Sequence, residues 1–321
     1  MKIPWKRIPW YPRSRRRPGE SLLRAILRAI SVRIIGYSLI LLILAPLNCC
    51  NGMFYQPSRE LFSLPSDLND SSRVEEVWFT SKDGTRLNAW FLHAMGEAKG
   101  TVLHFHGNAG NLSGHVDYVS WLPLAGFNVL VWDYRGYGKS EGSPARSGIH
   151  DDGIAALEYL RSRQDIDASR IAVFGQSLGG AVALDTVLNS NRKGIACVIV
   201  DSTFASYQSQ ANSFVGGTPF TFPFIWALVG ESCSPGSQIA AIAPVPILVI
   251  HGTADRIVAF ELGQEVFELA REPKVFWEIP GGGHTDAFGL RGATWRPRLT
   301  EYLTNCLDVA QHLSSLANPG S

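Results

Sequence analysis

The stretch around Ser177 has the residue types of a nucleophile in acyl transfer. Residues 175–179 read G-Q-S-L-G, with the β-prone run 171–174 before them and the helix-prone run 178–188 after them. Between a strand and a helix, G-x-S-x-G predicts a sharp turn that raises the serine hydroxyl above a sheet. The glycines leave room for the turn, and the new helix offers unpaired N–H groups beside the hydroxyl. Ser177 is therefore the candidate nucleophile.

Asp255 and His284 could activate this serine. Each follows an apolar run, at the ends of the last two predicted strands. A serine hydroxyl is a weak nucleophile near neutral pH, so it needs a base, and the base needs an orienting acid. We predict that His284 takes the Ser177 proton and later gives it to the leaving group, while Asp255 fixes the imidazole tautomer. Asp201, which ends the preceding strand, is the alternative acid.

Two backbone N–H groups are candidates for stabilising an oxyanion. An oxyanion hole needs two donors aimed at one point. Leu178, directly after the candidate nucleophile, supplies one donor. The second is expected from the Gly-containing loop 106–110, at Asn108.

The elements that must position these residues alternate between strands and helices. Such alternation predicts right-handed crossovers and a mostly parallel sheet with helices on both faces. Ligands bind beyond the carboxyl ends of such strands, where Ser177, Asp255 and His284 all fall. An Asp83-Gly84 turn between the first two strands predicts an antiparallel edge. The predicted strands are 74–80, 86–92, 101–105, 127–132, 171–174, 195–200, 245–250 and 275–279, and the predicted helices are 113–125, 150–163, 178–188, 260–270 and 297–313.

These patterns divide the chain into four parts. Residues 1–50 form a basic tail and a membrane segment, 51–73 a linker, 74–315 an α/β domain and 316–321 a tail. Within the domain, the stretch 203–238 breaks the alternation and is rich in aromatic residues, Gly and Pro. We interpret it as a short lid inserted over the site, with ordinary core packing as the alternative.

The N-terminal segment has the charge and hydropathy pattern of a signal anchor. The first 33 residues hold ten of the 29 Lys and Arg but one of the 28 acidic residues, and 34–47 is uncharged and apolar. A span needs about 20 residues, and no charge follows until Arg59, so the apolar stretch has room to extend. The basic flank predicts a cytoplasmic N-terminus and an exported domain, on the periplasmic, extracellular or lumenal side. Lipidation at Cys49 or Cys50, a cleaved signal and an amphipathic helix on the membrane surface are the alternatives.

Composition excludes several functions for the domain. The net charge of +1 is the balance of +9 in the first 33 residues and −8 elsewhere, so the domain has no basic character and we expect no nucleic-acid partner. The five cysteines are scattered, with no Cys or His spacing typical of a metal site. We therefore expect no metal site.

Five motifs together resemble the α/β-hydrolase superfamily. They are HGNAGN at 106–111, DYRGYGKSEG at 133–142, GQSLGG at 175–180, HGTAD at 251–255 and GGGH at 281–284. The set looks like the membrane-anchored ABHD-type, lysophospholipase-like branch of serine hydrolases. The resemblance implies an α/β-hydrolase fold and hydrolysis of esters or thioesters through an acyl-enzyme, without metal or organic cofactor.

The leading hypothesis is a serine hydrolase that cleaves an acyl lipid or small ester. A peptidase or amidase of the same fold is the alternative, because the same three residues can cleave amides. An acidic pocket for a substrate amine would distinguish it. A catalytically silent binding protein is the third hypothesis, although Ser177, Asp255 and His284 are all present.

Overall fold

A computed structural model describes residues 51–63, 68, 73–218 and 222–317, together with scattered positions between 19 and 36. The chain forms two compact units, Met1–Cys49 and Cys50–Ser321. The predicted membrane segment 34–47 lies outside the described residues, apart from Gly36. No helix within the described ranges has the length and apolar character that a bilayer span requires.

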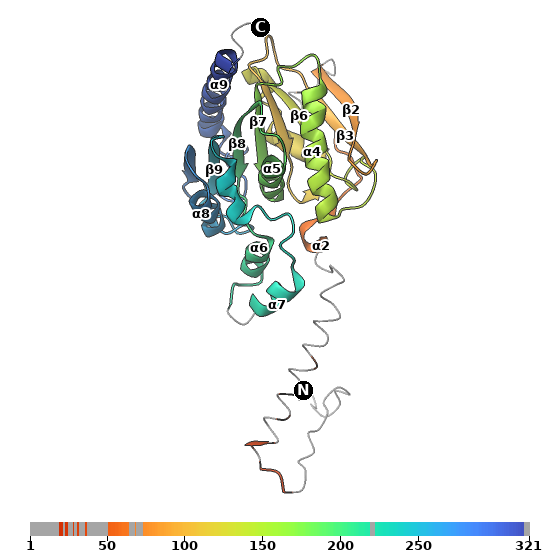
Figure 1. The fold of residues 1–321 in the computed structure, drawn as a ribbon, viewed down its shortest axis with the longest axis vertical. Coiled ribbons are helices and arrows are strands. Elements are labelled where there is room, and N and C mark those ends of the chain that lie inside the picture. Colours follow the sequence, from red (N-terminus) through yellow and green to blue (C-terminus); the bar gives the residue numbers. More distant parts are fainter. Residues whose placement is uncertain are drawn as a thin grey trace, which may run out of the picture. The chain divides into compact units, whose positions relative to one another are not determined.

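The second unit is built on an eight-stranded, mostly parallel sheet (Figure 1), as predicted. The strand order is β10-β9-β8-β7-β4-β6-β3-β2, in which β2 and β3 are antiparallel to their neighbours and all other pairs are parallel. The strands are β2 (Val74–Thr80), β3 (Arg86–Leu92), β4 (Thr101–Phe105), β6 (Asn128–Trp132), β7 (Ile171–Gln176), β8 (Ile195–Asp201), β9 (Ile247–Gly252) and β10 (Lys274–Ile279).

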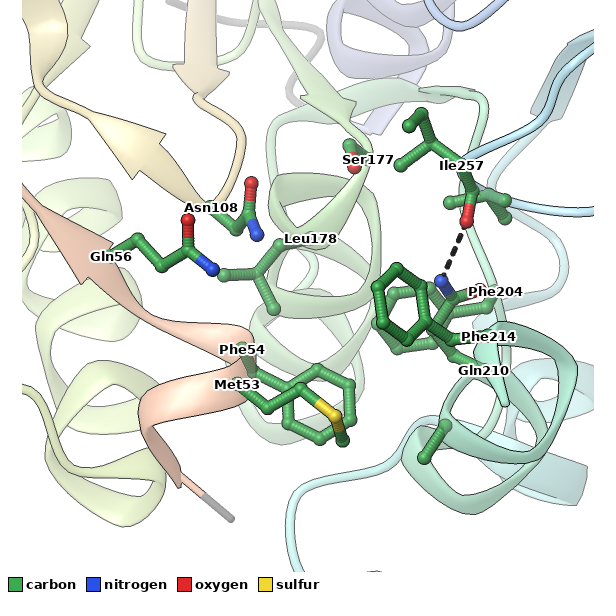
Figure 2. Close-up of a pocket in the computed structure, with 12 residues that line it drawn as sticks. Met53, Phe54, Gln56, Asn108, Ser177, Leu178, Phe204, Gln210, Phe214 and Ile257 are labelled. Atoms are coloured by element: carbon green, nitrogen blue, oxygen red, sulfur yellow. Dashed lines mark hydrogen bonds between the residues drawn. The ribbon is translucent and has the colours of Figure 1, made fainter. Parts of the chain in front are cut away.

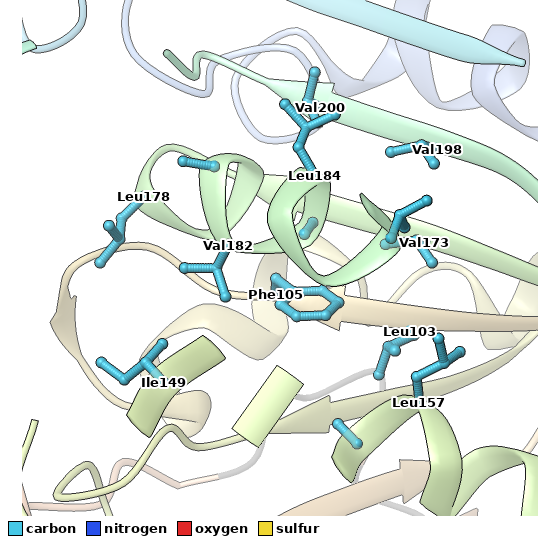
Figure 3. Packing of buried hydrophobic residues seen from close by; sticks show 14 of the residues in the cluster. Leu103, Phe105, Ile149, Leu157, Val173, Leu178, Val182, Leu184, Val198 and Val200 are labelled. Carbon is cyan, nitrogen blue, oxygen red and sulfur yellow. The ribbon is translucent and has the colours of Figure 1, made fainter. Parts of the chain in front are cut away.

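Helices cover both faces of the sheet because the central strands are apolar on both sides. One core joins the sheet to α4 (Arg146–Ser162), α5 (Leu178–Asn189) and α8 (Phe260–Leu269). The other joins it to α9 (Gly292–Ala317) and the segment 112–125. Adjacent residues Val102 and Leu103 of β4 point into opposite cores. Figure 3 shows α5 lying against β4, β7 and β8. The first residue of this helix, Leu178, directly follows Ser177.

The predicted helix 113–125 is wrong. The structure has a single turn, α3 (Leu112–His115), followed by two 3-10 turns, η4 (Val116–Tyr118) and η5 (Pro123–Ala125). Pro123 lacks the N–H that a continuing helix needs, and Gly126 ends the segment at φ 91°. The last helix begins at Gly292, before the predicted start at 297.

The segment 51–63, predicted as part of a linker, packs on the domain. It contains a helical turn, α2 (Asn51–Phe54), and a two-residue strand, β1 (Gln56–Pro57), which pairs in parallel with β5 (Ala109–Gly110). Phe54 is 5% exposed and packs edge-on against Tyr207, with ring centroids 4.9 Å apart. This apolar contact makes the segment part of the folded unit.

The predicted lid region contains two short helices and a 3-10 turn. These are α6 (Tyr207–Phe214), α7 (Phe222–Leu228) and η6 (Gly236–Ile242), and Figure 1 shows α6 and α7 together beyond one end of the sheet. Ser206 begins α6 by accepting a hydrogen bond from the Ser209 N–H, 3.0 Å away. Glu231 accepts hydrogen bonds from the Ser206 hydroxyl and the Gln208 N–H, which ties the two ends of this segment together.

Candidate active site

The turn at Ser177 has the strained geometry that the sequence predicts. Ser177 joins β7 to α5 at φ 54° and ψ −124°, a backbone conformation that residues other than Gly rarely adopt. A Cβ at position 175 would lie 2.3 Å from the Gly179 carbonyl oxygen, and one at 179 would lie 2.2 Å from the Phe105 oxygen. Only glycine fits at either position. The Ser177 N–H donates to the Asp201 carbonyl at 2.8 Å, which anchors the turn to β8.

Asp255 and His284 are in direct contact. His284 Nδ1 lies 2.8 Å from Asp255 Oδ2, while Asp255 Oδ1 accepts bonds from the N–H groups of Ile257 at 2.8 Å and Val258 at 3.0 Å. Burial tends to raise the pKa of Asp255, but hydrogen bonds from His251 and His284 outweigh it and hold this pKa below its usual range. The carboxylate is therefore ionised. It accepts a hydrogen bond from the Nδ1–H, which leaves His284 Nε2 as the basic nitrogen.

Ser177 and His284 line the same cavity of about 100 Å³, which we call the histidine cavity. Its other lining residues are Gly107, Asn108, Ala109, His115, Tyr118, Gln176 and Thr285. Within the described chain, no hydrogen bond joins the Ser177 hydroxyl to His284. Such contacts are often loose before substrate binds and tighten in the complex.

The Asn108 N–H is oriented by its neighbours. His106 Nδ1 donates to the Gly107 carbonyl at 2.8 Å. Because the C=O and N–H of a trans peptide point in opposite directions, this bond turns the Asn108 N–H away from His106. The Asn108 carbonyl in turn accepts from the Gln56 N–H at 2.9 Å and the Tyr137 hydroxyl at 2.7 Å. Leu178 is the first residue of α5, so its N–H has no partner within the helix.

Asp201, the alternative acid, has another set of partners. Its carboxylate accepts bonds from Gln176 Nε2 at 3.2 Å and from the Ser202 hydroxyl at 3.1 Å. The same hydroxyl accepts from the Thr285 N–H at 3.0 Å, next to His284. Burial raises the pKa of Asp201 to about 6, because nearby hydrogen bonds only partly offset its desolvation. Asp201 therefore supports the histidine loop through Ser202 and does not contact the imidazole.

A second cavity, of about 190 Å³, lies beside Ser177 and is lined mainly by apolar side chains. We call it the apolar cavity. Sequence reasoning missed the wall formed by Met53, Phe54 and Gln56, since these residues lie in the predicted linker. The apolar run 53–55 was the available signal. The lining residues are Met53, Phe54, Gln56, Asn108, Ser177, Leu178, Phe204, Gln210, Ala211, Phe214, Ile257 and Val258.

One group of potential metal ligands lies elsewhere. The donor atoms of His150, Asp185 and Cys233 are all within 4.8 Å of one another, a spacing that a metal ion could bridge. They come from three distant segments, so no sequence spacing indicates them. His150 Nδ1 also hydrogen-bonds to Asp185, and this bond raises the pKa of His150. The pair by itself links α4 to α5.

Known proteins share this architecture. The family model described as "Serine aminopeptidase, S33" matches residues 96–228. Uncharacterized protein YfhR of Escherichia coli K12 is 41% identical over 262 residues, which cover 80% of this chain and 88% of that protein. The alpha/beta hydrolase domain-containing protein WAV2 of Arabidopsis thaliana is 37% identical, covering 70% of this chain and 77% of the relative. The solved esterase Pf2001 of Pyrococcus furiosus has the same fold, with a TM-score of 0.63 at 22% identity, covering 78% of this chain and 98% of that structure.

The chain therefore belongs to the α/β-hydrolase superfamily. It is a hydrolase by family, and its mostly parallel sheet is the fold of that family.

Proposed function

We propose that this protein is a serine hydrolase that cleaves carboxylic esters or thioesters with Ser177, His284 and Asp255. The observation that carries the proposal is the Asp255–His284 hydrogen bond of 2.8 Å at a cavity that Ser177 also lines. In this reaction His284 Nε2 takes the Ser177 proton as Oγ bonds to the acyl carbon. The oxyanion that forms accepts hydrogen bonds from the backbone N–H groups of Asn108 and Leu178. The leaving alcohol or thiol departs with the proton from His284, and water then releases the acid by the same steps.

The lining of the two cavities favours esters over peptides with a free amine. An aminopeptidase needs a negative group for the substrate ammonium, and the family model that matches this chain bears that enzyme's name. Among the described residues that line either cavity there is no Asp or Glu. Amide cleavage is the second candidate function, and an aminoacyl p-nitroanilide would detect it.

The test is ester hydrolysis by the Ser177→Ala variant. We expect the kcat for p-nitrophenyl butyrate to fall by about 10⁶-fold, since the nucleophile is removed. Circular dichroism should show the fold retained. Ser232→Ala, at an exposed serine outside both cavities, is the matched control and should keep full activity. Equal turnover by Ser177→Ala would refute the assignment.

A fluorophosphonate probe tests the remaining hypothesis. An activated Ser177 should react with the probe and be found as the labelled residue by mass spectrometry. A folded protein that does not label would instead be a silent binding protein.

A further inference from the structure

The apolar cavity and the histidine cavity meet at Ser177, but only one of them reaches the candidate base. Both are lined by Ser177 and Asn108, so both adjoin the expected position of the reacting carbonyl. His284 lines only the histidine cavity. The two sides of the nucleophile are therefore chemically different.

This difference determines which half of an ester would occupy each cavity. In the mechanism proposed above, on which this inference rests, His284 must reach the leaving-group oxygen or sulfur to protonate it. The alcohol or thiol half therefore occupies the histidine cavity. The acyl half stays bonded to Ser177 in the intermediate and extends to the other side, into the apolar cavity.

The apolar cavity has two walls, one at the lower centre of Figure 2 and one toward its right. Met53 and Phe54 from α2 form one wall, and Phe204 and Phe214 form the other with Ile257. Gln210 uses its Nε2 to donate to the Ile257 carbonyl at 2.9 Å, which joins the lid helix α6 to the loop that carries Asp255. The walls thus offer an acyl chain mostly aliphatic and aromatic contacts.

The volume of this cavity limits the length of the chain. A cavity of about 150 Å³ in another protein holds benzene, a six-carbon ligand. A cavity of about 190 Å³ accordingly holds an acyl chain of about eight carbons. Longer chains would have to leave the cavity past Phe214, which is 67% exposed.

We propose that the apolar cavity is the acyl site for medium-chain acids of about eight carbons, and that Met53 sets this length. Met53 comes from the segment before the predicted α/β domain and is partly buried against its core. Its flexible thioether lies at the wall, where a change of side-chain size changes the room available. Substrate selection would then depend on a residue that the catalytic motifs do not include.

The test is the acyl-length profile of full-length variants with p-nitrophenyl esters of two to twelve carbons. These esters share one leaving group, so only the acyl side changes. For the unmodified protein, kcat/KM should rise about fourfold per methylene up to about eight carbons and then fall. Met53→Ala removes three side-chain heavy atoms and should move the optimum two to three carbons longer. Met53→Trp should move it shorter by a similar amount.

Met95→Ala is the matched control, because Met95 is 45% exposed and lines neither cavity. It should keep the original profile. If the Met53 variants fail to fold, Phe214→Ala opens the opposite wall at an exposed position and should lengthen the optimum as Met53→Ala does. An unchanged profile in folded wall variants, or a preference of the unmodified protein for acetate, would overturn the acyl site while leaving ester hydrolysis intact. Hydrolysis that survives Ser177→Ala would instead overturn the proposed function.

Discussion

His284 hydrogen-bonds to Asp255 and not to Asp201, although both carboxylates are buried and lie at the ends of the adjacent strands β9 and β8. We expect Asp255→Asn to lower kcat by about 10⁴-fold, because an uncharged amide does not hold the Nδ1–H of His284 as a carboxylate does and the imidazole loses its productive tautomer. Asp201→Asn is the isosteric control and should cost much less, since Asp201 acts through Ser202. The measurement is kcat of both variants with p-nitrophenyl butyrate. A larger loss in Asp201→Asn would reverse the assignment of the acid.

The buried carboxyl of Asp201 should also make the free energy of unfolding depend on pH. Burial raises the pKa of Asp201 from an ordinary 3.8 to about 6. Between these values the folded state keeps a proton that the unfolded state releases, so the free energy of unfolding falls as pH rises through this window. The Asp201→Asn variant has no carboxyl at this position, so its free energy of unfolding does not fall for this reason. Relative to the unmodified protein, it should gain up to about 3 kcal/mol between pH 4 and pH 7 in urea unfolding. Parallel pH curves for the two proteins would contradict the raised pKa.

At the residue scale, the sequence predicts the candidate reacting groups better than their surroundings. Ser177, Asp255 and His284 could be singled out because each follows a β-prone run and their order matches one architecture. The bond from His106 to the Gly107 carbonyl was not identifiable, since it depends on how a loop folds back. Met53 was missed for a similar reason. Its cavity is built from segments far apart in the chain.

At the element scale, local signals explain both the successes and the failures. The strands β2, β3 and β4 have the predicted bounds, because turn-forming residues interrupt the β-prone runs: Asp83-Gly84 lies between β2 and β3, and Gly100 precedes β4. The helix predicted at 113–125 failed because Pro123 and short-range turns outweigh a weak apolar period. The segment 51–63 looks like a linker by composition, and only tertiary contacts show that it belongs to the domain.

The contacts of α2 predict that this segment is part of the folding unit. Phe54 is buried against Phe204 and Tyr207, and Arg146 lies over its ring at 5.7 Å. Phe54→Ala should lower the free energy of unfolding by about 3 kcal/mol, because it leaves a cavity that the surroundings only partly fill. Phe62→Ala, at a ring that is 59% exposed, should cost under about 1 kcal/mol. Equal effects in urea denaturation would mean that α2 merely rests on the surface.

At the scale of the whole molecule, charge divides the chain into two parts. The first 33 residues carry +9 and the remainder carries −8, with the uncharged run 34–47 at the junction. Basic residues on the N-terminal side of an apolar segment favour a cytoplasmic N-terminus. We propose that this segment anchors the protein and that the hydrolase domain lies on the exported side. Along the sequence, five residues, 48–52, separate the apolar run from Met53.

Sodium carbonate extraction of membranes from cells that produce the full chain tests this anchor. The unmodified protein should stay in the pellet, because an apolar segment of about 20 residues inserts stably. The double variant Leu41→Arg and Leu42→Arg should move to the supernatant, since each charge at the centre of a span costs about 3 kcal/mol. Leu61→Arg, on the 37% exposed Leu61 of the hydrolase domain, should stay with the membrane. Release of the full-length unmodified protein by carbonate would exclude the anchor and leave the catalytic proposal untouched.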